Sequence, residues 1–165
     1  MESIRVTRRE ALAAAAGAAL ASAPLAAHAQ EASAPAALAH FGFTKLQCAD
    51  LEKCAAFYTR AAGLVEQTRV NTDSGGRKLS EIIFQPTAPG GASFVLIHYY
   101  DSPKPVVGEL ILGFQTSDLA AFVARALEAG GSVVREAWEI TEMKIRVAFV
   151  ADPEGHVIEL VQPLA

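Results

Sequence analysis

The residues best placed to do chemistry lie near the end of the chain, where a tight turn leads into a short apolar strand. Segment 152–156 reads Asp-Pro-Glu-Gly-His, with proline and glycine at positions that favour a β-turn. Segment 157–161 alternates, so Ile158 and Leu160 share one face and Glu159 points to the other. A carboxylate on an apolar face costs free energy unless it is paired or solvated. Glu159 therefore indicates a lined cavity, a metal site, or an edge strand with its side chain in water.

An internal repeat provides the elements that must position this strand. Segments 43–51 and 111–119 are similar, because each is a short strand ending in an aspartate, Asp50 or Asp118, that can cap a helix. Apolar residues at helical spacing follow each aspartate, and glycine follows each helix. Three strand candidates come after each helix, at 65–70, 79–84 and 94–100 and again at 132–137, 143–150 and 156–162. The order βαβββ thus occurs twice, which predicts an α+β fold.

Neither copy has enough hydrophobic material to be stable alone. We therefore expect two tandem βαβββ modules that pair their curved mixed sheets around a shared central cavity. The predicted domain covers residues 41–162, with modules at 41–101 and 108–162 and a short proline-containing linker between them.

The N-terminal residues predict export. Arg8 and Arg9 precede an uncharged, alanine-rich run, and small residues around Ala29 offer a cleavage site. The paired arginines are typical of a twin-arginine signal. Ala11 stands where such signals usually have phenylalanine, which leaves the general secretory route open. We expect a signal at 1–29, a flexible leader at 30–40, and a periplasmic or secreted mature protein.

Composition narrows the partners of the mature protein. The full chain has a net charge of −4 at pH 7, and loss of the expected signal, which holds three arginines and two glutamates, would make it −5; this acidity argues against nucleic acid and anionic membrane surfaces. The apolar part of the signal is short and mostly alanine, so no membrane span is expected. The two cysteines, Cys48 and Cys54, fit no zinc motif; two buried free thiols are the favoured interpretation, and a disulfide formed in an oxidising compartment is the alternative. A homodimer is an open alternative.

The repeat order, the strand–Asp–Leu starts and the closing segment 152–160 together resemble the vicinal oxygen chelate superfamily. This superfamily includes glyoxalase I, extradiol dioxygenases and the bleomycin-resistance proteins. Segment 51–58 also resembles the first helix of the family, and the resemblance covers residues 41–162. It implies the fold but no single activity, because this fold hosts many chemistries.

The resemblance also implies where a metal would be held. Metal-dependent members carry one ligand on the first and last strand of each module, and these positions match Phe43, Leu96, Ile111 and Glu159. Only Glu159 has a donor atom, so no metal or other cofactor is expected. The alternative is a divalent metal at a displaced site formed by Glu159, His98 and Glu109.

These observations favour a binding protein that encloses a small apolar or aromatic molecule between the modules. The expected pocket residues lie on strand faces turned away from the helices: Phe43, Lys45, Gln47, Phe94, Leu96, His98, Ile111, Gln115 and Glu159. Glu159 would form an ion pair with Lys45, or else be protonated or hydrated. The alternative is a glyoxalase-type lyase, isomerase or dioxygenase, in which Glu159 is the base or a residual metal ligand and His98 is its acid/base partner.

Overall fold

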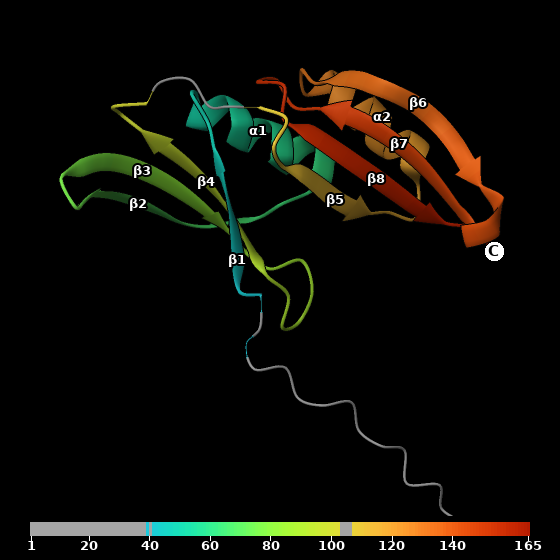
Figure 1. The fold of residues 1–165 in the computed structure, drawn as a ribbon, viewed down its shortest axis with the longest axis horizontal. Coiled ribbons are helices and arrows are strands. Elements are labelled where there is room, and N and C mark those ends of the chain that lie inside the picture. Colours follow the sequence, from blue (N-terminus) through green and yellow to red (C-terminus); the bar gives the residue numbers. More distant parts are fainter. Residues whose placement is uncertain (1–38, 40, 103–106) are drawn as a thin grey trace, which may run out of the picture. The chain divides into compact units, whose positions relative to one another are not determined.

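The structure is a computed structural model that describes residues 39, 41–102 and 107–165. The expected signal, nearly all of the leader and most of the linker lie outside these residues. The elements follow the order β1 (Phe43–Gln47), α1 (Leu51–Ala62), β2 (Glu66–Ser74), β3 (Arg77–Phe84), β4 (Ser93–Tyr99), β5 (Ile111–Gln115), α2 (Leu119–Glu128), β6 (Ser132–Ile140), η2 (Thr141–Met143), β7 (Ile145–Ala151) and β8 (Val157–Pro163) (Figure 1). The prediction of two tandem βαβββ modules is confirmed. Across the described ranges, no helix is both long and apolar enough to cross a membrane.

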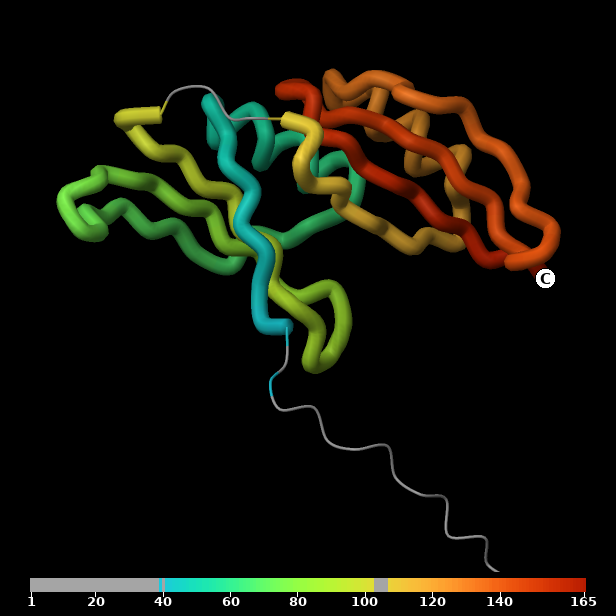
Figure 2. The backbone as a smooth tube through the Cα atoms, viewed as in Figure 1, coloured from blue at the N-terminus to red at the C-terminus, as the bar shows by residue number. Residues whose placement is uncertain are grey.

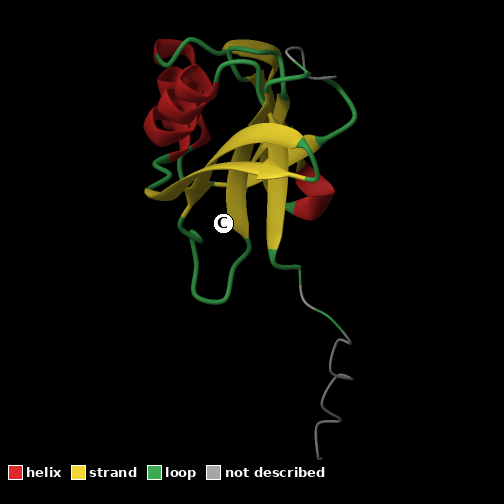
Figure 3. Ribbon diagram, turned by 90° about the vertical axis from the view of Figure 1, so that its left-hand side faces the viewer, coloured by secondary structure: helices red, strands yellow, loops and turns green. Residues whose placement is uncertain are grey.

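Each module forms its own four-stranded mixed sheet, in the orders β1-β4-β3-β2 and β5-β8-β7-β6. The first strand of each module pairs in parallel with the last, so Phe43 faces Ser93 and Ile111 faces Val157. All other pairs are antiparallel. Figure 3 shows these curved strands from the side. The two sheets do not close on each other around a central cavity, which differs from the expectation (Figure 1).

The aspartates and a glycine set the ends of the helices as the sequence predicts. Asp50 accepts a hydrogen bond from the Lys53 amide at 3.0 Å, and Asp118 accepts one from the Ala121 amide at 2.9 Å. Gly63 ends α1 with a φ of 69°, a left-handed conformation that glycine adopts without steric strain.

A single hydrophobic core joins the two modules, which explains why the sheets stay open. α1 lies against α2, and the helix-facing side chains of both sheets pack around them. The shared core includes Tyr58 and Phe57 of α1, Leu96 of β4, and Leu160 of β8. Among the described residues, neither α1 nor α2 covers the opposite sheet faces, which we call the open faces, although central-strand residues such as Val95 and Ile97 are buried there as well.

Two local features differ from the sequence-based expectation. β2 runs on to Ser74, and the hairpin turn is limited to Gly75 and Gly76, whose φ values are 62° and 83°. Trp138 lies just beyond the strand expected at 132–137, but β6 runs on to Ile140 and includes it, and its ring stacks on Phe149 at a centroid distance of 5.8 Å. Cross-strand aromatic packing of this kind stabilises a strand.

Candidate functional site

Glu159 lies on the open face of the second sheet. Its strand neighbours Ile158 and Leu160 are fully buried in the shared core, so Glu159 points to the opposite side. It pairs in register with Gly113 of β5 and Phe149 of β7. Ile111 lies in β5 with 54% of its surface exposed, so it does not form the wall of an enclosed cavity.

The open face of the first sheet carries an ion pair that the sequence analysis missed. Lys45 of β1 pairs with Glu81 of β3, not with Glu159. The side chain of Glu81 is only 10% exposed, whereas that of Lys45 is 40% exposed. Phe43 lies beside them, with the Lys45 ammonium 5.7 Å from the centre of its ring. The sequence does contain a sign of this pair, because Glu81 is a lone carboxylate within the mainly apolar segment 79–84. The same kind of pattern singled out Glu159.

The expected placement of Phe94, Leu96 and His98 on this open face is wrong. Leu96 is fully buried in the shared core, and the Phe94 ring lies 4.8 Å from that of Tyr58 in α1. His98 points to the same helix-facing side, where its Nδ1 donates a hydrogen bond of 2.9 Å to the Cys48 carbonyl.

The error has a physical cause. β4 is buried on both faces, so it lacks the alternation of apolar and polar residues that would reveal its register. The β4 residues that share the open face with Lys45 are Val95 and Ile97, which are both buried and have no donor atoms. The match of Leu96 to a ligand position is therefore displaced by one residue.

The structure also separates the residues of the alternative sites. His98 faces α1 in the first module, whereas Glu159 lies on the open face of the second sheet. Glu109 is exposed before the start of β5. The described residues thus bring together neither the displaced His98, Glu109 and Glu159 metal set nor the His98 and Glu159 acid/base pair.

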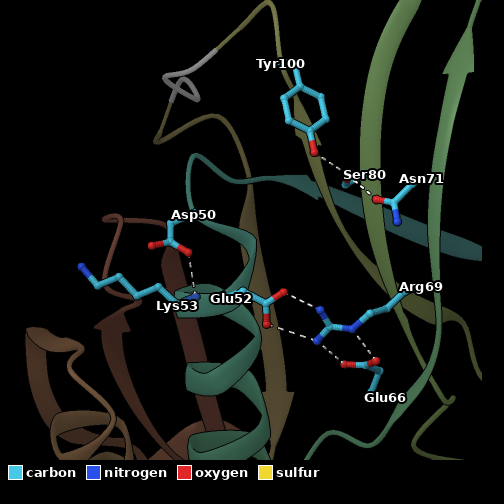
Figure 4. Close-up of polar contacts among 8 residues, drawn as sticks. All are labelled: Asp50, Glu52, Lys53, Glu66, Arg69, Asn71, Ser80 and Tyr100. Atoms are coloured by element: carbon cyan, nitrogen blue, oxygen red, sulfur yellow. Dashed lines mark hydrogen bonds and ion pairs between the residues drawn. The ribbon is translucent and has the colours of Figure 1, made fainter.

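A polar cavity of 510 Å³ lies between the start of α1 and the helix-facing side of β2, β3 and β4. Figure 4 shows its polar contacts. Ser80 Oγ donates to Asn71 Oδ1 at 2.5 Å, so the Tyr100 hydroxyl, 3.0 Å away, donates to Ser80. Arg69 bridges Glu52 of α1 and Glu66 of β2, and its hydrogen bonds to Glu66 and Glu52 raise its pKa. His98 also lines this cavity, which can therefore hydrogen-bond a polar ligand.

A second cavity, of 410 Å³, lies at the junction of the two modules, and we call it the junction cleft. Residues from both modules form its apolar walls: Leu64 and Phe94 from the first, and Leu112, Phe114 and Phe122 from the second. The loop at 85–92, which projects from the domain in Figure 2, supplies Gln85 and Thr87 to its rim. Of the nine expected pocket residues, Phe94 and Gln115 line this cleft, and His98 lines the polar cavity.

Arg125 of α2 is the charged residue of the junction cleft. Its Nε donates to the Ala61 carbonyl at 3.1 Å, which fixes the side chain across the helix–helix contact. Its guanidinium carbon lies 5.5 Å from the centre of the Phe122 ring. Because one nitrogen holds the side chain in place, the remaining N–H groups can bind an anionic group on a molecule in the cleft.

The turn at 152–156, which precedes the strand of Glu159, is held by a buried hydrogen-bond network around Asp152. Asp152 accepts hydrogen bonds from the Tyr58 hydroxyl at 3.1 Å, from His156 Nδ1 at 2.8 Å, and from the amides of Glu154 and His156. Burial acts to raise the pKa of Asp152, but the hydrogen bond and charge of His156 outweigh it, and the pKa is lowered. Burial beside Asp152 raises the pKa of Tyr58. These groups join the modules rather than face a ligand.

Comparison with known proteins defines the family. The glyoxalase-like domain family matches residues 43–161, so the chain belongs to this family within the vicinal oxygen chelate superfamily. It is 28% identical over 121 residues to a probable lactoylglutathione lyase of Vibrio parahaemolyticus, covering 72% of this chain and 87% of that protein. The lactoylglutathione lyase of Neisseria meningitidis serogroup B is 27% identical over the same shares.

Solved structures share the fold at lower identity. A glyoxalase family protein from Bacillus cereus superposes with a TM-score of 0.67 and 19% identity, covering 80% of this chain and 99% of that one. A mutant of glyoxalase I from Zea mays gives a TM-score of 0.62 and 20% identity over 73% of this chain and 45% of that one.

Proposed function

We propose that the chain is an exported glyoxalase-like domain that binds a small, mainly apolar or aromatic molecule in the junction cleft. The observation that carries this proposal is the composition of the cleft: Phe94, Phe114 and Phe122 approach from both modules around 410 Å³ of space. Aromatic walls with a few placed polar groups are typical of small-molecule sites. The proposed site is at the junction of the modules, on their helix-facing sides rather than on the sheet faces turned away from the helices.

Arg125 narrows the class of ligand. A guanidinium group beside an apolar wall favours a molecule with an aromatic or aliphatic body and one carboxylate. Gln85 and Gln115 supply neutral hydrogen bonds at the same cleft. Small aromatic carboxylates are therefore the ligand class that we propose.

Binding without the usual metal is supported by the side chains at the family's ligand positions. Phe43 and Ile111 have no donor atoms, and neither do Val95 and Ile97, which replace Leu96 on the open face. Glu159 is the one donor among them. A single carboxylate does not hold a divalent ion in competition with water.

A second candidate function is a lyase, which the relatives named lactoylglutathione lyase favour. Glu159 would then be the base, acting without His98. Assaying the purified chain for formation or breakdown of lactoylglutathione, with and without added divalent metal, tests this candidate. Turnover that disappears in Glu159→Gln would replace the binding proposal.

Titration with benzoate and the neutral benzamide, followed by NMR, tests the binding proposal. Loss of a charge-assisted hydrogen bond predicts that Arg125→Gln weakens benzoate binding roughly tenfold and benzamide binding much less. Phe114→Ala should weaken both ligands. Arg146→Gln is the matched control, because Arg146 is an exposed residue of β7 that pairs with Glu139. Benzoate binding that neither Arg125→Gln nor Phe114→Ala changes would exclude the junction cleft.

A further inference from the structure

Cys48 and Cys54 form a buried pair that the proposed function does not use. Cys48 follows β1 and Cys54 lies in the first turn of α1, and neither side chain is exposed. Their Sγ atoms and a carboxylate oxygen of Glu154 all lie within 4.8 Å of one another. Within the described ranges, no other three His, Cys, Asp or Glu side chains come close enough to hold a metal ion. Two thiols at this separation can act as metal ligands or join to each other.

We propose that Cys48 and Cys54 are an oxidation site, at which an intramolecular disulfide forms when the chain folds in an oxidising compartment. The two sulfurs lie within 4.8 Å of each other, on the end of a strand and the start of a helix that are adjacent in the chain. Formation of the bond in such a compartment is common for exported proteins.

The hydrogen bonds that the thiols now make are weak and can be lost without leaving a buried acceptor unpaired. Cys48 Sγ donates to the Leu46 carbonyl at 3.7 Å, and Cys54 Sγ donates to Asp152 at 4.0 Å. Asp152 keeps its hydrogen bonds from Tyr58, His156 and two amides when the Cys54 hydrogen is removed. Oxidation therefore costs the surrounding network little.

The surroundings favour a disulfide over a metal ion. The adjacent Cys48 thiol, burial, and the nearby charges of Asp152 and Glu154 raise the pKa of Cys54, whereas a metal ligand must be a thiolate. Each oxygen of Glu154 already accepts a backbone N–H, from Ala49 at 2.8 Å and Asp50 at 2.6 Å. A disulfide is uncharged, so it fits a buried site beside two carboxylates better than a pair of thiolates.

The oxidant in this reaction is a disulfide compound, either a thiol–disulfide oxidoreductase or oxidised glutathione. The thiolate of one cysteine attacks the oxidant's disulfide, forms a mixed disulfide and releases one thiolate of the oxidant. The second cysteine, after losing its proton, attacks the sulfur of the first and releases the other thiolate. The chain loses two protons and two electrons, and the oxidant is reduced to two thiols. Because both thiols are buried in the folded chain, the reaction occurs during folding or transient opening.

The bond would hold two contacts of the polar cavity in place. The carbonyl of Cys48 accepts the hydrogen bond from His98, and the amides of Ala49 and Asp50 between the cysteines hold Glu154 of the other module. Oxidation thus fixes the turn between β1 and α1 on which both contacts depend.

Refolding the reduced, denatured full chain in a glutathione redox buffer tests the proposal, independently of export. The quenched chain is denatured with N-ethylmaleimide and its mass is measured. We expect wild type to be two hydrogen atoms lighter and unlabelled, with two labels added only after reduction. The oxidised chain should melt about 5–10 °C above the reduced chain.

Single substitutions Cys48→Ser and Cys54→Ser are the matched controls, and each should carry one label or one glutathione. If either fails to fold, the double substitution Cys48→Ala with Cys54→Ala provides the reference for the melting temperature. Wild type that takes two labels after equilibration would overturn the proposal, and so would a disulfide that lowers the melting temperature. Binding of one Zn²⁺ per reduced chain, lost in both serine variants and protecting the thiols from oxidation, would instead establish a metal site with Glu154.

Discussion

The ring of Phe57 in α1 packs directly against the main chain at Gly131, the residue before β6. A Cβ atom built on Gly131 would lie 2.7 Å from Phe57 Cε2 and 2.5 Å from the Ala151 carbonyl oxygen. Phe57 belongs to the first module and Gly131 to the second, and Phe57 is 1% exposed. The modules therefore meet at a contact that has no room for a methyl group.

Gly131→Ala should destabilise the domain by about 2–4 kcal/mol, because either the ring or the backbone must shift. Gly113→Ala is the control, since no atom lies within 4 Å of its added Cβ and its φ is not positive. Urea denaturation of both variants measures the difference. Equal stability of the two variants would mean that the module contact is looser than the structure has it.

His156→Gln should destabilise the domain by about 3 kcal/mol near pH 5.5, because it removes one partner of a buried pair. Burial acts to lower the pKa of His156, but the hydrogen bond and charge of Asp152 outweigh it, so the folded-state pKa is raised. The stabilisation by protonated His156 is thus complete below about pH 6.5, the unfolded value, and is lost as the pH rises through the higher folded value. Asp152 has a lowered pKa, so its own contribution is present above about pH 3.9 and is lost only in stronger acid.

Denaturation curves at pH 5.5 and pH 9 check this prediction. The loss in His156→Gln should be smaller at pH 9, where wild type has also lost the charge of His156. The exposed pair of Arg77 and Asp101 is the control, because solvent screens this pair and Arg77→Gln should change the stability little at either pH. A loss that does not change with pH would show that His156 acts only through packing.

Lys45→Met should destabilise the domain by about 1–3 kcal/mol, since it leaves the nearly buried Glu81 carboxylate without its partner. The double variant Lys45→Met with Glu81→Met should recover most of that loss, because no unpaired charge remains. A double-mutant cycle in urea measures the coupling. Additive losses would contradict an energetically coupled pair.

The mature protein should carry no stoichiometric divalent ion at Glu159, and a chelator should leave its melting temperature unchanged. Elemental analysis and a thermal melt with and without chelator check both statements. Glu159→Gln should keep the fold and the binding of neutral ligands, because the side chain lies outside the shared core. One tightly bound ion per chain that disappears in Glu159→Ala would require a metal-dependent function.

Replacement of Arg8 and Arg9 by lysines should block export if the twin-arginine route is used, and the exported form should begin near Gln30. Fractionation followed by N-terminal sequencing measures both. Unchanged export of the double-lysine variant would assign the chain to the general secretory route.

The fold followed from the sequence because its signals are local and repeated. Asp50 and Asp118 each cap a helix at the end of a strand, and the order of elements recurs after both. The positions of the site residues could not be predicted in the same way, and β4 shows why. Leu96 lies in a strand buried on both faces, and such a strand carries no alternation from which its register can be read.

The way in which one module packs on the other could also not be predicted from the sequence. Each module has one apolar face that needs a cover, but the pattern does not say whether the helix-facing or the open faces will meet. The helix-facing faces meet, so Phe43 and Ile111 remain more than half exposed and Phe94 lines the junction cleft. Arg125 was missed because a charged residue in a helix gives no sign that it spans a contact with Ala61.

The starts of both helices are held by residues of the last turn and the last strand, and this affects the order in which the chain can fold during synthesis. The amides of Ala49 and Asp50 are held by Glu154, and the amide of Leu119 at the start of α2 is held by Gln162 at 3.0 Å. A ribosome releases residues 152–162 only after α1 and its sheet have emerged. The first module therefore cannot complete these contacts until the second has been synthesised. A product truncated before Asp152 would leave Tyr58 and the start of α1 without these hydrogen-bond partners.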